Sequence, residues 1–396
     1  MSEKRTTEET KKRRSGRTNY RPWIRLVIRL AIIAAVILCI FLIWKNWRKI
    51  APEALLDWTD QVFGDAETGE GFPRKITGNT VRDMAEVNQH LVVLSDTTLR
   101  FFNADAACMV ERTHSFSEPT MQTAGKFVML TEQGGNRIRL DTRRETILEK
   151  TFEDRRVIYS GTLLSNGMTA LVMNATSQSY TSEMVVLNVK GDILYTYKSN
   201  KYLLTDVALS SDGDKVAVIG TSANNGVLRS VLLVITMDTK EVKEYTGTDV
   251  LLHNVDFFEN DTVFVLGDRE VWTLTEGDEQ PIKTSCDGVA PVGIDVSDTL
   301  AAVALRRDGT TNEGTIWVFA SSGKRLYAQE YVGDLRSIKV QGDAVTVLTD
   351  TSLYALDKSG LEKTYPVPED CLMALLYQNE PMILTLNELK RAENNG

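Results

Sequence analysis

Side chains suited to acid–base or metal chemistry are few and far apart in this chain of 396 residues. The histidines are His90, His114 and His253, and none is spaced like the paired imidazoles that hold a metal on one helix or strand. His90 stands at the start of an expected strand and His253 in an apolar run, which favours structural or surface roles. No nucleophile-elbow, P-loop or dinucleotide-binding motif occurs. The sequence therefore predicts no catalytic residue, no cofactor and no metal site, and we expect a protein that is not an enzyme.

Four cysteines offer little redox or metal chemistry. Cys39 lies in a long apolar run, and Cys108, Cys286 and Cys371 are widely separated, without the close pairs of metal sites. At most one disulfide can form among the last three, and whether it does is left open. Burial as small hydrophobic residues is the favoured expectation.

The elements that must position any site are β-strands. From about residue 72 onward, short runs rich in Val, Ile, Leu, Thr and Tyr alternate with Asp/Asn/Gly/Ser turns. They recur as sets of four about every 40 residues, the period of a β-propeller blade. The first seven sets begin near Val81, Thr120, Val157, Leu203, Val250, Val289 and Leu335.

An eighth set begins at Cys371 but stops after three strands. The residues from Arg74 to Thr77 are available as its missing fourth strand, and such pairing would leave no exposed sheet edge in the ring. The sequence thus predicts an all-β fold with eight blades, seven being the alternative. A pair of β-sandwiches would explain the alternation but not the recurrence.

Two turns carry a family resemblance. Residues 210–213 read SSDG between two apolar strands, and residues 316–323 read IWVFASSG, a strand ending in a glycine turn. These resemble TolB-like, WD40-like and quinoprotein-like propellers. The whole arrangement resembles a family of membrane-anchored propellers from Gram-positive-type bacteria. The repeated Gly-His…Trp-Asp pairs of WD40 propellers are missing, and no catalytic residue follows from the resemblance.

Before the strands, residues 30–44 form one uncharged apolar run, and the helical pattern extends back to Trp23. Arg25 and Arg29 can reach lipid headgroups from such a helix, and Trp23, Trp44 and Trp47 mark its interfacial ends. We expect an uncleaved membrane anchor over residues 23–44. A cleaved signal peptide is the main alternative, but no small-x-small cleavage site ends the run.

Charge sets the expected orientation. Residues 1–44 carry ten basic and three acidic side chains, or +7, so the remainder carries −9 − 7 = −16. The positive-inside bias places residues 1–22 in the cytoplasm and the rest outside. An exterior of −16 disfavours nucleic acid as a partner. Residues 45–71 are expected to form a membrane-proximal amphipathic helix and an acidic linker, and residues 72–392 the extracytoplasmic propeller at the cell membrane.

Three longer polar segments offer a candidate binding surface. Residues 176–183, 221–228 and 306–314 follow the second strand of three blades, and such insertions gather on one propeller face. Ordinary variable loops are the alternative interpretation. The candidate contact residues are Tyr180, Asn224, Asn225, Arg306 and Arg307.

These features predict a membrane-tethered propeller that acts as a non-enzymatic protein-interaction or scaffold module at the cell envelope. One alternative is a ligand sensor working through a membrane partner, since 22 cytoplasmic residues leave no room for an output domain. Another is an enzyme with its site in the propeller funnel, which a buried acidic cluster with perturbed pKa values would favour.

Overall fold

The computed structural model describes residues 69–76, 80–153, 155–224, 226–286, 288–307 and 312–393. The predicted tail, membrane anchor and membrane-proximal helix lie outside these residues, and so do Trp23, Arg25, Arg29, Trp44 and Trp47. Within the described ranges, no helix has the length and apolar character needed to cross a membrane.

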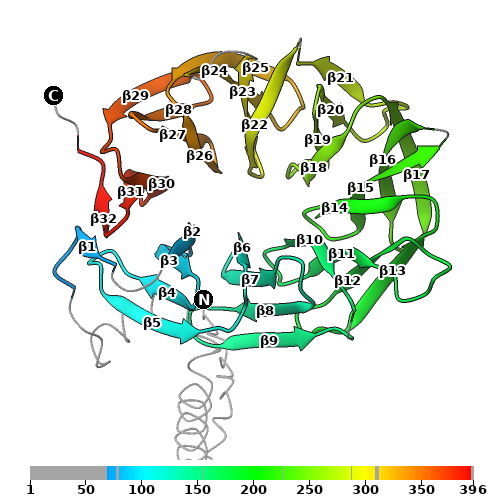
Figure 1. Cartoon of the computed structure of the whole chain (residues 1–396), viewed down its shortest axis with the longest axis horizontal. Helices are drawn as coiled ribbons and strands as arrows, with labels where there is room; N and C mark the ends of the chain where they lie inside the picture. Colours follow the sequence, from blue (N-terminus) through cyan, green and yellow to red (C-terminus); the bar gives the residue numbers. More distant parts are fainter. Residues whose placement is uncertain are drawn as a thin grey trace, which may run out of the picture. The chain divides into compact units, whose positions relative to one another are not determined.

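The described chain forms a β-propeller of eight four-stranded antiparallel sheets around a central opening (Figure 1). The prediction of an all-β propeller with eight blades is therefore confirmed, and the seven-bladed alternative is wrong. In blades 1 to 7 the strands run in chain order from the centre outward. Blade 1 holds β2 (Val81–Val87), β3 (His90–Ser95), β4 (Thr98–Phe102) and β5 (Cys108–Thr113). Blade 2 holds β6 (Pro119–Ala124), β7 (Phe127–Glu132), β8 (Arg137–Asp141) and β9 (Thr146–Thr151). Blade 3 holds β10 (Ile158–Leu163), β11 (Thr169–Asn174), β12 (Ser182–Leu187) and β13 (Ile193–Ser199).

The middle blades contain the longest strands. Blade 4 holds β14 (Leu203–Leu209), β15 (Lys215–Asn224), β16 (Val227–Thr236) and β17 (Glu241–Thr248). Blade 5 holds β18 (Leu252–Phe257), β19 (Val263–Gly267), β20 (Glu270–Leu274) and β21 (Ile282–Ser285). Blade 6 holds β22 (Val289–Val296), β23 (Leu300–Arg307), β24 (Glu313–Ala320) and β25 (Arg325–Val332). Blade 7 holds β26 (Leu335–Gln341), β27 (Ala344–Thr349), β28 (Ser352–Asp357) and β29 (Gly360–Pro366).

Blade 8 is built from both ends of the described chain. It holds β30 (Cys371–Tyr377), β31 (Glu380–Thr385) and β32 (Glu388–Arg391), and its outer strand is β1 (Arg74–Lys75), paired antiparallel with β32. The predicted closure of the ring by the segment at Arg74 is thus confirmed. The Tyr377 hydroxyl donates to the Gln89 carbonyl at 3.0 Å and so joins blade 8 to blade 1.

The hydrophobic core lies between blades rather than in the centre. Second and third strands are buried on both faces because neighbouring blades cover them; β12, for example, is buried at every position. Their continuous apolar sequences suit this two-sided burial. Outer strands such as β9 are mostly exposed.

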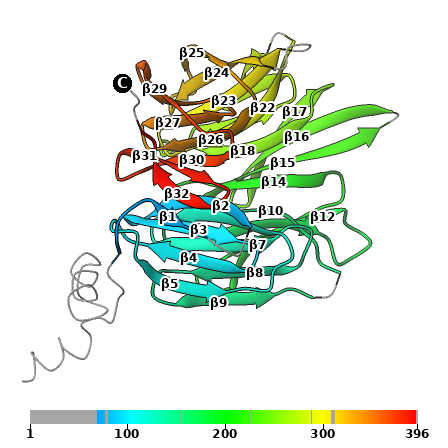
Figure 2. The ribbon, with the colours of Figure 1, turned by 60° about the vertical axis from the view of Figure 1, so that its left-hand side comes forward.

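The antiparallel order defines two faces. On one face lie the first-to-second and third-to-fourth strand connections, and here the chain enters β1, with the Gly71 amide bonded to the Asp105 carbonyl at 3.0 Å. We call it the terminal face. On the opposite face lie the second-to-third connections and the links between blades. We call this one the long-loop face, because the hairpin of β15 and β16 extends there beyond its neighbours (Figure 2).

Candidate functional site

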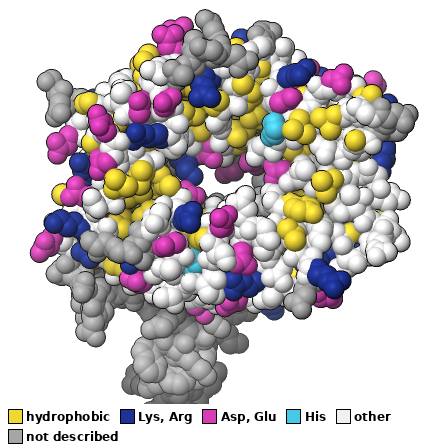
Figure 3. All heavy atoms as spheres, viewed as in Figure 1, with side chains coloured by type: hydrophobic (Ala, Val, Ile, Leu, Met, Phe, Trp, Pro, Cys, Tyr) yellow, Lys and Arg dark blue, Asp and Glu magenta, His cyan; other side chains and the backbone are white. Residues whose placement is uncertain are grey.

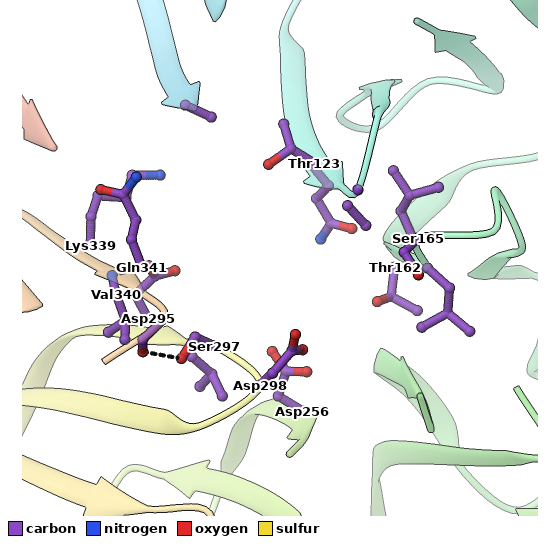
Figure 4. A pocket seen from close by; sticks show the side chains of 18 of the residues that line it. Thr123, Thr162, Ser165, Asp256, Asp295, Ser297, Asp298, Lys339, Val340 and Gln341 are labelled. Atoms are coloured by element: carbon purple, nitrogen blue, oxygen red, sulfur yellow. Dashed lines mark hydrogen bonds between the residues drawn. The ribbon is translucent and has the colours of Figure 1, made fainter. Parts of the chain in front are cut away.

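A cavity of about 800 Å³ occupies the central channel at the terminal face. Residues of the innermost strands line it together with the turns that follow them. Figure 4 shows Lys339, Asp295 and Asp256 on neighbouring blades, across the opening from Thr123 and Thr162. The channel therefore combines charged and hydroxyl side chains drawn from several blades.

Three carboxyl groups of this channel region have pKa values near neutrality. Burial raises the pKa of Asp256 to about 7, with Asp206 and Asp295 adding to the rise and the Phe257 amide opposing it. The Phe257 amide donates to Asp256 Oδ1 at 2.8 Å. Burial likewise raises the pKa of Asp206 to about 6 and that of Asp295 to about 6.

Hydrogen bonds from neighbouring blades hold two of these carboxylates. Asp206 Oδ2 accepts from the Val255 amide at 2.9 Å, and its other oxygen accepts from the Ser160 hydroxyl. Asp295 Oδ2 accepts from the Val340 amide at 2.6 Å. Each carboxylate thus bridges its own innermost strand to that of the next blade.

One cation balances part of this negative charge. Lys339 Nζ lies 3.2 Å from Asp83 Oδ1 in an ion pair across blades 7 and 1. Burial alone would lower the pKa of Lys339, but Asp83 and Asp295 outweigh it and raise that pKa. Lys339 is therefore held as a cation beside the carboxyl cluster.

Carboxyl groups that titrate near neutral pH can take up and release protons under physiological conditions. No histidine or cysteine is among the cavity's described lining residues. Across the described ranges, no group of three or more His, Cys, Asp or Glu side chains is arranged to hold a metal ion. The channel thus offers proton transfer and binding of cationic groups as its chemistry.

Sequence reasoning missed this carboxyl cluster, although a signal was present. Asp83, Asp206, Asp256 and Asp295 each stand in a first strand directly before an apolar residue. In most blades the pairing register shifts near the start of this strand, as between Leu204 and Asp206. Such bulges change the direction in which side chains point. The alternation of polar and apolar residues along a strand does not predict where they occur.

Four of the predicted contact residues, Tyr180, Asn224, Arg306 and Arg307, belong to the long-loop face of three blades. Tyr180 lies between β11 and β12 and is 40% exposed, with Lys198 Nζ 5.8 Å from its ring centre. Arg306 is exposed near the end of β23. Asn224 ends β15 and Arg307 ends β23, and their side chains, like Asn225, lie outside the described part of the chain.

Exposed apolar side chains gather on this same face. Figure 3 views the long-loop face and shows hydrophobic side chains in patches around the central opening. Other large exposed apolar residues of the described chain, such as Ile193 and Ile282, lie on outer strands instead. Those at the long-loop face are Tyr159, Tyr180, Leu203, Val227, Leu228, Val292, Val332 and Leu386.

The histidines and cysteines have structural surroundings. His90 is buried beside the Asn88 carbonyl, and the His114 ring lies 3.1 Å from the Ser95 carbonyl. His253 is exposed on β18. Cys286 and Cys371 are buried as expected, and Cys108 is partly buried.

Solved structures resemble the fold at low sequence identity. BamB from Moraxella catarrhalis matches with a TM-score of 0.51 and 10% identity, over 83% of this chain and 98% of that chain. Sqt1 from Saccharomyces cerevisiae matches with a TM-score of 0.53 and 8% identity, over 83% of this chain and 100% of that chain. These similarities establish the propeller fold. No curated protein sequence matches the chain. One family model, described as a family of unknown function (DUF5711), matches residues 59–384.

Proposed function

The chain belongs to that family of unknown function, and from this premise we propose that it is a single-pass membrane protein displaying its propeller outside the cytoplasm as a non-enzymatic protein-docking module. The observation that carries the proposal is the set of exposed apolar side chains on the long-loop face. Exposed apolar patches on a protein surface mark interaction sites.

The longest hairpin contributes to this surface. β15 and β16 each span ten residues, whereas β11 and β12 of the preceding blade each span six. Val227 and Leu228 begin β16 and are 40% and 37% exposed. Two apolar side chains near the tip of a paired hairpin are positioned to contact a partner rather than the protein's own core.

The exposed apolar side chains lie on the face opposite to the one where the described chain begins. The described chain enters the propeller at the terminal face, where the Gly71 amide bonds to the Asp105 carbonyl. The proposed docking surface is the long-loop face.

Charge complementarity defines the partner's chemistry. The chain after residue 44 carries −16, because residues 1–44 hold +7 of the total of −9. Like charges across an interface are unfavourable, and opposite charges accelerate encounter. The partner proposed is therefore a protein surface that is apolar at its centre and cationic at its rim.

Site-specific photo-crosslinking in cells tests the docking surface. A photoreactive residue placed at Leu228 and another at Val332 should capture one and the same partner, whereas placement at Ile193 on β13 should not. Leu228→Asp should abolish capture from position 332, because a buried carboxylate at an apolar contact is costly. Equal capture from Ile193, or capture that survives Leu228→Asp, would refute docking at this face.

The tether has its own test. Alkaline carbonate extraction should leave the protein in the membrane pellet, and external protease should degrade the propeller but spare residues 1–22. Recovery of the intact chain in the supernatant would refute the anchor.

Acid–base catalysis in the channel is the second candidate function. Three carboxyl groups with raised pKa values beside a cavity of about 800 Å³ favour it, since perturbed carboxyls are a feature of active sites. A deletion strain complemented with Asp256→Asn/Asp295→Asn or with Leu228→Asp separates the two functions. Docking predicts that only Leu228→Asp fails to complement, and catalysis predicts that only the double variant fails.

A further inference from the structure

A second cavity, of about 420 Å³, opens between blades 6 and 7 on the long-loop face. Its volume lies within the range of about 300–1,000 Å³ that is usual for small-molecule sites. The end of blade 6 and the link into blade 7 form its walls, separate from the central channel. The lining residues are Val292, Arg306, Tyr331, Asp334 and Leu335.

Two other blade junctions are closed at this level by a serine. Between blades 3 and 4, the Ser182 hydroxyl donates to the Tyr202 carbonyl and accepts from the Leu204 amide, both at 2.9 Å. Between blades 4 and 5, Ser230 makes the same two bonds, to Val250 and Leu252. The buried Tyr202 and Val250 side chains fill those junctions.

The junction of blades 6 and 7 has glycines at both positions. Gly314 pairs with Tyr331 on the outer strand as Ser182 pairs with Ser199, and Gly333 lies two residues before Leu335 as Tyr202 lies two before Leu204. Neither glycine carries a side chain, and atoms of neighbouring residues occupy the space beside both. The Tyr331 ring and hydroxyl lie beside Gly314, and the Thr349 and Asp350 side chains lie beside Gly333. This junction therefore lacks the serine bridge of the other two, and a buried tyrosine packs at that level instead.

The polar side chains around the cavity make no hydrogen bond to other described residues. Tyr331 is only 3% exposed, yet its hydroxyl makes no hydrogen bond with any described residue. Arg306 and Asp334 are exposed, and no ion pair joins them in the described part of the chain. Burial raises the pKa of Tyr331, with Arg306 opposing the rise and Asp334 adding to it. A guanidinium donor, a phenol and a carboxylate acceptor thus line one small cavity.

The remaining wall is apolar. Val292 is 37% exposed, and Leu335 packs on the core between blades 6 and 7. Aliphatic surface lies beside the charged groups, so the cavity matches a molecule that carries both charges and a short apolar arm.

We propose that this cavity binds a small zwitterion, an α-amino acid with an aliphatic side chain. The ligand's carboxylate accepts from Arg306 and the Tyr331 hydroxyl, its ammonium group binds the Asp334 carboxylate, and its side chain packs on Val292 and Leu335. An anion alone would leave Asp334 unpaired, and a cation alone would leave Arg306 unpaired. A charge left without a partner on binding costs affinity, which favours the zwitterion. This site goes beyond the docking function, because it requires no protein partner.

Isothermal titration of the full-length protein in detergent micelles tests the site. L-leucine, L-isoleucine and L-valine are the probes, and at least one should bind saturably at one site per chain. Two analogues of leucine, 4-methylpentanoate and isoamylamine, lack one charge each and should bind about tenfold more weakly or worse. No saturable binding of any probe, or equal binding of an analogue, would overturn the proposal.

Variants then connect binding to the cavity. Arg306→Gln and Asp334→Asn should each weaken binding of the best probe about tenfold or more, because each removes one charge-assisted contact. Tyr331→Phe should weaken it less. Arg269→Gln is the matched control, an exposed arginine of blade 5 on the same face. Circular dichroism verifies that each variant is folded. Wild-type affinity in both Arg306→Gln and Asp334→Asn would place the ligand elsewhere and refute the site.

Discussion

At the scale of single residues, the channel carboxyls oppose stability when they ionise. Asp256 lies between Asp206 and Asp295 on the neighbouring blades, and each adds to the rise in its pKa. Burial is the largest cause, because the channel wall replaces most of the water around the carboxylate. Ionising a buried carboxyl group costs free energy of folding. Replacing the carboxyl with an uncharged amide therefore measures that cost.

We predict that Asp256→Asn makes the protein more stable at about pH 8 and leaves it nearly unchanged at about pH 4. The folded-state pKa of about 7 lies above the unfolded value of 3.8, so the folded state binds the proton more tightly. That contribution is fully present below pH 3.8 and is lost as the pH rises through 7. One unit of pKa shift corresponds to about 1.4 kcal/mol, so a gain of at least about 1 kcal/mol is expected at the higher pH.

Chemical denaturation of the full-length protein in micelles at both pH values measures this effect. Asp298→Asn, at the exposed mouth of the same cavity, is the control and should alter the pH dependence far less. A loss of stability in Asp256→Asn at about pH 8 would contradict the cause assigned to the pKa shift.

At the scale of elements, the junctions between blades depend on a few side chains that satisfy backbone groups. Ser182 supplies both an acceptor and a donor to the link between blades 3 and 4. We predict that Ser182→Ala lowers the free energy of unfolding by about 1–3 kcal/mol, because it leaves the buried Leu204 amide and Tyr202 carbonyl without a partner. Urea denaturation of the full-length protein measures the loss. Ser179→Ala, in the exposed loop nearby, should change stability very little, and an equal loss in both variants would be incompatible with this account.

The elements also show what the sequence could and could not predict. The eight blades could be predicted because strands and turns repeat with a fixed period. The closing role of Arg74 could be predicted because the last set lacks a fourth strand. The cavity between blades 6 and 7 could not be predicted, because its lining residues come from four strands and a link whose packing the sequence pattern does not specify. Arg306 was selected from its loop position, but its neighbours Tyr331 and Asp334 follow only from the packing of adjacent blades.

At the scale of the whole molecule, the ring is held shut by contacts between the two ends of the described chain. β1 adds only two residues to blade 8. The Phe72 and Tyr377 rings pack edge to face with centroids 6.1 Å apart, and Leu389 is fully buried in the core that blade 8 shares with blade 1. Each of the other blades is covered by a neighbour on both sides. Closure of the ring covers the sheet faces of the first and last blades in the same way, and these faces would otherwise be exposed.

Leu389→Ala should therefore destabilise the entire propeller rather than blade 8 alone. A cavity at a fully buried leucine costs about 2–5 kcal/mol, and loss of the closing contacts is shared around the ring because every blade packs on two others. Unfolding of full-length Leu389→Ala, followed by circular dichroism and by tryptophan fluorescence in parallel, should show one transition at a lower denaturant concentration. Leu386→Ala, three residues away and 64% exposed, should fall within about 0.5 kcal/mol of the wild type. An early separate transition in Leu389→Ala would mean that the end blades unfold independently, and cooperative closure would then be the wrong description of this ring.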